Sequence, residues 1–276
     1  MLWYLVLFLQ TFQNNFMNTI DAKYPIAEKV PTELEIHGDT RIDDYFWMRL
    51  SDEQKNAEEK DAQTQKVYNY LEEENSYYSE ITSHTDQFQK ELFEEMKSRI
   101  KEDDSSVPYK KNGYYYITRF QKGFQYPIFA RKKESLESEE IILFNVNELA
   151  KGFDYFQLGG LNVSPDNTLV AFAVDTVSRR QYTLQIKNLE TGETYQDTIE
   201  NTTGGSVWAN DNKTLFYTKK DPLTLRSYKI YKHVLGTDVS EDVEVFHEQD
   251  ETFNTSVGKT KSQKYIVIAS YSTLST

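Results

Sequence analysis

The hydrophobic and polar positions of this 276-residue chain follow two different periods. Between residues 51 and 107 there is no Gly or Pro, and apolar residues such as Phe88, Leu92 and Met96 recur at the spacing of amphipathic helices. Ser51, followed by two acidic residues, is a good N-cap. We therefore expect two or three helices between about residues 52 and 101, with Glu72–Glu74 on a solvated face. An extended arm is expected to precede them, over Tyr24–Ile36.

From Pro108 onward, short β-rich runs replace the helical spacing. They are bounded by Gly, Asn, Asp and Pro and include residues 114–118, 128–130, 141–144 and 183–186. Strands that follow one another with no helix between them favour antiparallel pairing. A hairpin turn is expected at Asn188–Glu193, where Gly192 is free to adopt positive φ.

Three segments of this β-rich region repeat one pattern, a polar turn followed by an apolar strand. They begin at Ser164, Ala209 and Thr260, so the offsets are 45 and 51 residues, in the repeat range of propeller blades. The predicted fold is mainly β with an N-terminal helical arm, and its β part is an incomplete β-propeller. We divide the chain into a leader (1–23), an extended and helical arm (24–107) and a partial propeller (108–276) that ends within a blade. We therefore expect a part of a longer protein.

The first twelve residues are an apolar run too short to span a bilayer. No basic residue precedes Lys23, so the run is not an ordinary secretory signal. We expect the true start at Met17 and a cytoplasmic protein with no membrane partner. The alternative is an atypical export signal, which would place the protein in the periplasm.

Charge and composition exclude several classes of function. The 44 acidic and 31 basic residues give a net charge of −13, which disfavours nucleic acid as a partner. This charge indicates an acidic surface or, alternatively, attraction of cationic substrates. The chain has no cysteine, which excludes disulfides, thiol nucleophiles and cysteine-ligated zinc. The many Tyr and Phe residues are expected to pack between strands, with a sugar-binding platform as the weaker alternative.

No catalytic, cofactor-binding or metal-binding residue is predicted. The motif His-Glu-x-x-His, phosphate-binding glycine loops and the nucleophile motif Gly-x-Ser-x-Gly are all absent. The nearest approach to the last, Gly204–Trp208, lacks the second glycine. His233 and His247 lie in strand-like sequence and are expected to be structural. The adjacent pairs Asp43-Asp44 and Asp103-Asp104 are weak candidates for general acid and base.

Nine stretches, in order between residues 24 and 276, carry a family resemblance. They are Asp43–Arg49, Tyr70–Tyr77, Glu94–Ile100, Val163–Asn167, Asp175–Tyr182, Lys187–Gly192, Val207–Asn212, His233–Thr237 and Asp250–Phe253. On these residues the chain resembles the N-terminal part of oligopeptidase B, in the prolyl oligopeptidase family of serine peptidases.

The resemblance implies a seven-bladed propeller joined to an α/β-hydrolase domain whose Ser, Asp and His perform acyl transfer. In that family the propeller covers the active site and admits only short peptides, and oligopeptidase B cleaves after Arg or Lys. The implied partners are therefore short basic peptides and a C-terminal hydrolase domain. This sequence lacks the region that holds the triad, so we transfer no catalytic residue and expect the chain alone to be inactive.

Two further questions stay open at the level of sequence. Arg179 and Arg180 are interpreted either as part of a local salt bridge that holds their loop, which we favour, or as groups that face an inter-domain cavity and control its closure. The whole chain has a second interpretation too, as a free-standing propeller-like interaction module that assembles with itself or with a partner. In a third, a separate polypeptide supplies the remaining blades and the hydrolase domain.

Overall fold

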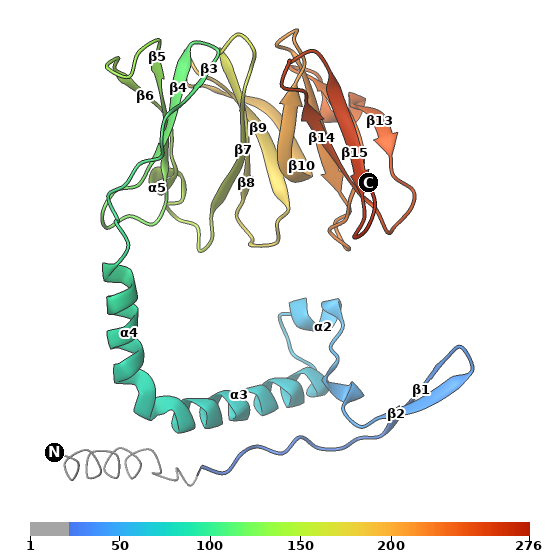
Figure 1. Ribbon diagram of the computed structural model, residues 1–276. Helices are drawn as coiled ribbons and strands as arrows, with labels where there is room; N and C mark the ends of the chain where they lie inside the picture. Colours follow the sequence, from blue (N-terminus) through green and yellow to red (C-terminus); the bar gives the residue numbers. More distant parts are fainter. Residues whose placement is uncertain (1–21) are drawn as a thin grey trace, which may run out of the picture. The chain divides into compact units, whose positions relative to one another are not determined.

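The computed structural model describes residues 22–276. Nearly all of the predicted leader (1–23), and the predicted start at Met17, lie outside the described residues. The described residues form two compact units, one that ends at residue 100 and one that covers residues 101–276 (Figure 1).

The first unit holds a strand hairpin and the helices. Its elements are β1 (Thr32–Ile36), β2 (Asp39–Asp43), the 3-10 helices η1 (Phe46–Met48) and η2 (Ser83–Thr85), and the helices α2 (Asp52–Asn56), α3 (Ala62–Thr82) and α4 (Asp86–Ser98). The prediction of two or three helices is confirmed. The Ser51 hydroxyl accepts from Gln54 N, and the Gln54 side chain accepts from Ser51 N, so Ser51 caps α2 as expected.

The segment expected to be an extended arm, Tyr24–Ile36, ends in a strand whose pairing was not predicted. Residues 32–36 are strand β1, which pairs with β2 through a turn at His37 and Gly38, both at positive φ. Residues 22–31 carry no regular element and lie along α3. The indole N–H of Trp47 donates to Glu28 O at 2.9 Å, and Lys66 pairs with the Glu28 carboxylate at 2.6 Å. These contacts fasten the extended segment to the helical part of the first unit.

The second unit is a row of antiparallel sheets. The first blade has β3 (Tyr109–Lys111), β4 (Tyr114–Arg119), β5 (Ile128–Lys133) and β6 (Glu140–Asn145), followed by α5 (Val146–Leu149). The next sheet orders β7 (Gln157–Val163), β8 (Leu169–Asp175), β9 (Tyr182–Asn188), β10 (Thr194–Trp208), β11 (Thr214–Lys220), β12 (Ser227–Val234) and β13 (Val243–His247), with η3 (Val239–Glu241) before β13. The last pair is β14 (Asn254–Lys259) and β15 (Ile266–Tyr271). Each of the three predicted repeats supplies the turn and the second strand of one hairpin: β7–β8, β10–β11 and β14–β15.

The seven-stranded sheet consists of two blades joined by the long strand β10. Its first part pairs with β9 and its last part with β11. Strand β10 is thus the outermost strand of the second blade and the innermost strand of the third. The predicted fold class is confirmed, since the described residues are mainly β, the pairs are antiparallel, and the sheets do not close into a ring.

The core lies between the blades. Strand β8 is buried on both faces, which explains its unbroken apolar run. Val170 and Phe172 pack towards the first blade, against Phe144 and Leu143. Ala171 and Ala173 pack towards the third blade, in a cluster that includes Trp208. Successive side chains of a strand point to opposite faces, so β8 contributes to the apolar cores on both of its sides.

The innermost strands β7 and β10 approach closely at two glycines. A Cβ atom on Gly160 would lie 1.6 Å from the carbonyl oxygen of Gly204, and both residues have positive φ. Beside this contact, Asn162 Nδ2 donates to Ser206 O at 2.6 Å and Trp208 Nε1 donates to Asn162 O at 2.8 Å. Glycine is thus needed on both strands for the blades to pack.

The innermost hairpin of every blade turns at a residue in the left-handed region. These residues are Asn112 (φ 48°), Asn167 (φ 68°), Asn212 (φ 58°) and Gln263 (φ 60°). The turns also bind one another: Asn167 Nδ2 donates to Asn112 O at 3.1 Å, and Asp166 N donates to Asn212 Oδ1 at 3.0 Å. The turn at Gly192 also has positive φ, as predicted.

Candidate functional site

A cavity of about 640 Å³, which we call the loop pocket, lies among loops of the second unit. It is bounded by the end of the β8–β9 loop, the β11–β12 loop and the segment that leads from β13 to β14. Its lining is polar and mixed in charge, and includes Arg180, Lys220, Arg226, Tyr228, His247 and Glu251.

The β8–β9 loop is shaped by the buried carboxylate of Asp175. This side chain is 1 % exposed and accepts hydrogen bonds from the backbone N–H groups of Val177, Ser178 and Arg180, at 2.9, 3.0 and 2.7 Å. Ser178 and Arg180 have positive φ, which turns the backbone around the carboxylate. One acidic side chain at the end of β8 therefore fixes the path of the loop.

The same loop is tied to the β11–β12 loop. Lys220 Nζ donates to Arg180 O at 2.9 Å, and Gln181 Nε2 donates to Pro222 O at 3.1 Å. The pKa of Lys220 is lowered, first by burial and then by the charge of Arg180. Arg226 donates to the carbonyl oxygens of Phe253 and Glu248. These contacts make one wall of the pocket from two neighbouring blades.

Arg179 and Arg180 are exposed, and their guanidinium groups form no ion pair or hydrogen bond within residues 22–276. The favoured interpretation, a local salt bridge that holds the loop, is therefore wrong. The physical reason is that Asp175, the acidic group of the loop, uses its oxygens on backbone N–H groups. The two side chains are left free to meet a group outside the described chain, and Arg180 lines the loop pocket.

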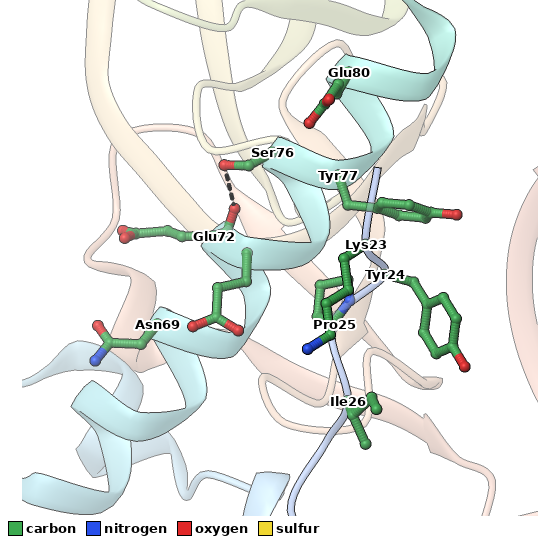
Figure 2. A pocket seen from close by; sticks show the side chains of 10 residues that line it. Lys23, Tyr24, Pro25, Ile26, Asn69, Glu72, Ser76, Tyr77 and Glu80 are labelled. Carbon is green, nitrogen blue, oxygen red and sulfur yellow. Dashed lines mark hydrogen bonds between the residues drawn. The ribbon is translucent and has the colours of Figure 1, made fainter. Parts of the chain in front are cut away.

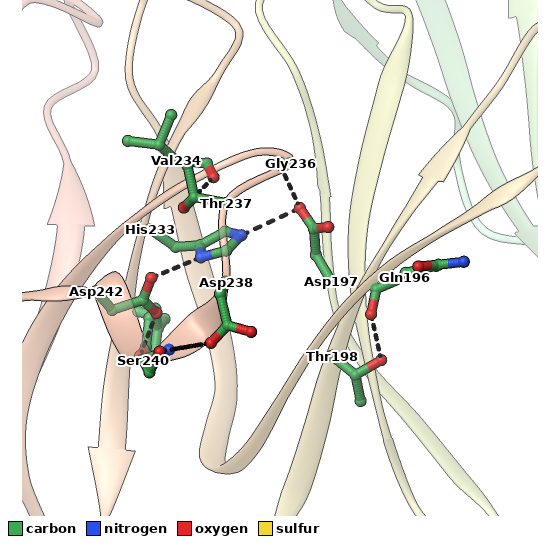
Figure 3. A network of polar contacts seen from close by, with 11 residues as sticks. Gln196, Asp197, Thr198, His233, Val234, Gly236, Thr237, Asp238, Ser240 and Asp242 are labelled. Atoms are coloured by element: carbon green, nitrogen blue, oxygen red, sulfur yellow. Dashed lines mark hydrogen bonds and ion pairs between the residues drawn. The ribbon is translucent and has the colours of Figure 1, made fainter.

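His233 lies in a buried polar network between the second and third blades (Figure 3). The ring is 0 % exposed; its Nδ1 lies 2.6 Å from Asp242 Oδ1 and its Nε2 lies 3.1 Å from Asp197 Oδ2. Tyr217 donates to Asp242 Oδ2 at 2.8 Å, and burial together with Asp242 raises the pKa of Tyr217 far above its ordinary value. Both ring nitrogens are engaged and shielded from solvent, which agrees with the predicted structural role.

His247 differs from His233 in its surroundings. Its side chain is 38 % exposed and meets the ring of Tyr228 edge-on, with centroids 5.5 Å apart. It lines the loop pocket, a position that its strand-like sequence did not reveal.

A second cavity, of about 720 Å³, lies within the first unit between the extended segment and α3 (Figure 2). Lys23 and Tyr24 line one side, and Glu72, Glu73 and Glu80 line the other. Glu72 and Glu73 are exposed, as predicted for a solvated helix face, whereas Glu74 is half-buried and accepts from Tyr70. Within the described residues, these carboxylates are not placed to bind a metal ion together.

No catalytic arrangement appears among the described residues. Gly204–Trp208 lies within strand β10, so Ser206 stands in a sheet and not at a strand-to-helix elbow. Asp44 pairs with Lys29, and Asp104 with Lys101. Residues 22–276 hold no group of three or more His, Asp or Glu side chains placed to bind a metal ion. The same residues include no helix that is both long and apolar enough to cross a bilayer.

The sheets of the second unit form an open row of blades with apolar cores between them, which is the architecture of a β-propeller domain. The chain belongs to the prolyl oligopeptidase family: the family model "Prolyl oligopeptidase, N-terminal beta-propeller domain" matches residues 24–276. The resemblance seen in the sequence is thereby confirmed.

Relatives and solved structures agree with this assignment. The chain is 39 % identical over 269 residues to a dipeptidyl aminopeptidase BI of Pseudoxanthomonas mexicana, covering 92 % of this chain and 35 % of the relative. It is 34 % identical over 258 residues to a protease 2 of Moraxella lacunata, covering 91 % and 36 %. Oligopeptidase B from Leishmania major superposes with a TM-score of 0.78 at 30 % identity, covering 91 % and 36 %. The chain thus spans about a third of the length of these proteins.

Proposed function

We propose that the chain is the non-catalytic, substrate-gating propeller portion of an oligopeptidase B-like serine peptidase that cleaves short peptides after Arg or Lys. The observation that carries this proposal is the family match over residues 24–276, in a chain that spans 35 % of its 39 %-identical relative. The triad then lies in an α/β-hydrolase domain outside residues 22–276, and the chain alone is inactive. We keep the division into an arm (24–107) and a partial propeller (108–276), and a cytoplasmic location, as parts of this proposal.

Exposed apolar side chains in the first unit support the proposal that the chain is part of a larger protein. Helix α4 carries four exposed apolar side chains, Phe88, Leu92, Phe93 and Met96, and Ile100 follows two residues after its end; all five are 40 to 68 % exposed. Exposed apolar patches of this kind mark interaction surfaces. We propose that the hydrolase domain covers this face of the arm. Among the described residues of the second unit, β15 pairs with β14 alone, so its other edge is open to a further strand of the same blade.

The first test is the size and activity of the native product. We expect an immunoblot of the source cells, with an antibody raised to this chain, to show a band far above 32.4 kDa. We expect the purified 276-residue chain to release nothing from Arg- or Lys-containing peptides. A native band at 32.4 kDa in a monodisperse oligomer would instead support the free-standing interaction module, and hydrolysis by the chain alone would refute the proposal.

A second candidate specificity follows from the relative with the higher identity, which is named a dipeptidyl aminopeptidase. That name refers to release of dipeptides from a free amino terminus, whereas the proposed cleavage after Arg or Lys does not need one. The full-length protein, assayed on one Arg-containing peptide with its amino terminus free or acetylated, separates the two. Equal cleavage of both peptides supports the oligopeptidase, and cleavage of the free peptide alone supports the dipeptidyl aminopeptidase.

We propose that Arg179 and Arg180 take part in inter-domain gating. Their free guanidinium groups stand on a loop whose backbone is fixed by Asp175, so they present charge without holding the loop. In the full-length enzyme, Arg179→Ala/Arg180→Ala is expected to change peptide turnover about tenfold, as loss of charged contacts at a closing interface would do. Lys213→Ala, which removes a charge from a different turn, is the control. Unchanged turnover in the double variant would rule out gating by these residues.

A further inference from the structure

A cavity of about 230 Å³ lies among the innermost strands of the four blades, and we call it the inner-strand pocket. Its polar lining is Lys111 of β3 with Asn112 next to it, Asn162 of β7, Lys259 of β14, and Gln263 in the turn after β14. Trp208 of β10 closes one side. No carboxylate from residues 22–276 lines it, although the whole chain carries a net charge of −13.

Lys111 and Lys259 bring two ammonium groups to this pocket, and hydrogen bonds hold that of Lys259 in place. Lys259 Nζ donates to Trp208 O at 2.8 Å and to Asn210 Oδ1 at 2.6 Å, which leaves one of its three N–H bonds unassigned. Burial lowers the pKa of Lys259, and the charge of Lys111 lowers it further. Asp211 opposes this shift, but its carboxylate accepts from the backbone N–H groups of its own turn, at Lys213 and Thr214.

The second ammonium group has no partner. Lys111 is half-buried, and its side chain forms no ion pair or hydrogen bond within the described chain. Two cations that face one partly buried space disfavour each other, and an anion between them would relieve that cost. The side-chain amides of Asn112 and Gln263 each donate one N–H, to Pro165 O and Thr260 O, and each has a second N–H.

We propose that the inner-strand pocket binds a carboxylate, the C-terminal carboxylate of a short peptide. The pocket is several times larger than the volume of one water, about 30 Å³, so it accepts a group of several heavy atoms. Lys ammonium groups and amide N–H groups are suitable donors to a carboxylate. The choice of a peptide as the source of the carboxylate rests on the proposed function, because the chain's relatives are peptidases. The site itself rests only on the two lysines and the cavity.

The test is a calorimetric titration of the 276-residue chain with trialanine as the free acid and as the C-terminal amide. We expect the free acid to bind at least about tenfold more tightly, since hydrogen bonds to a charged group each contribute roughly 1.5–3 kcal/mol. Lys111→Met should weaken the free acid by a similar factor, and Lys111→Arg should restore part of it. Lys111 is the position to change because its ammonium group makes no hydrogen bond or ion pair among the described residues, and Met keeps the length of its apolar stem.

Lys110→Met is the matched control. Lys110 is exposed on the same strand, lies over the ring of Tyr115 and does not line the pocket, so its loss removes one charge without touching the site. Equal binding of acid and amide, or unchanged binding in Lys111→Met, would overturn the proposal. Binding of sodium sulfate without binding of the peptide acid would refute the peptide assignment. The titration does not depend on hydrolysis, so an inactive or free-standing protein would leave its result valid.

Discussion

Gly160→Ala is expected to lower the free energy of unfolding of the propeller part by roughly 2–5 kcal/mol. A left-handed backbone costs a residue with a Cβ about 1–2 kcal/mol. The new Cβ would also lie 1.6 Å from Gly204 O, so β7 and β10 must separate, and overpacking of this kind costs typically 1–3 kcal/mol. Separation would further strain the contacts of Asn162 with Ser206 and Trp208. Urea titration followed by Trp fluorescence and circular dichroism measures the loss.

Gly192→Ala separates the two causes. Gly192 also has positive φ (79°), but no atom lies within 4 Å of its Cβ position, so only the backbone term of about 1–2 kcal/mol applies. Equal losses for the two variants would mean that the contact between β7 and β10 does not hold the blades together. If Gly160→Ala fails to fold while Gly192→Ala folds, the contact with Gly204 O is the cause, because Gly192→Ala carries the backbone strain alone.

The blade repeat could be predicted from the sequence because turn chemistry and strand pattern lie close together along the chain. Ser164-Pro-Asp-Asn and Ala209-Asn-Asp-Asn place an Asn at the left-handed position. The hairpin of the first blade was not among the three predicted repeats; its turn, Asn112-Gly113, follows two lysines and lacks the Asp that precedes Asn167 and Asn212. The joining of two blades through β10 could not be predicted, since it depends on pairing partners on both sides of a single long strand.

The sequence also could not predict what covers the apolar face of α4 or how the polar side chains of the loops pair. Helical periodicity predicted α4, but it states only that a face is apolar and not what covers it, and that face is exposed. The salt bridge expected for Arg179 and Arg180 failed because the sequence does not show how Asp175 uses its oxygens. Similarly, the partners of His233 are 36 and 9 residues away along the chain, and only the fold brings them together.

His233→Ala is expected to destabilise the propeller part by about 3–5 kcal/mol, the range for removing one partner from a buried ionic network. The ring lies within hydrogen-bond distance of both carboxyl groups, with Nδ1 2.6 Å from Asp242 Oδ1 and Nε2 3.1 Å from Asp197 Oδ2. Asp197 and Asp242 are 9 % and 3 % exposed, so removal of the ring leaves two buried carboxylates that Gly236 N and Tyr217 only partly satisfy. Urea titration at neutral pH measures the change.

His247→Ala is the matched control, because this ring is 38 % exposed and its nearest carboxylate oxygen, on Glu244, is 4.0 Å away. A surface change of this kind should cost about 0.5 kcal/mol or less. A double-mutant cycle then identifies the cause: in an Asp197→Asn/Asp242→Asn background, His233→Ala should cost much less, since no carboxylate stays buried without a partner. If His233→Ala lowers the free energy of unfolding just as much in that background, the ring stabilises the blades through packing and not through its contacts with the carboxylates.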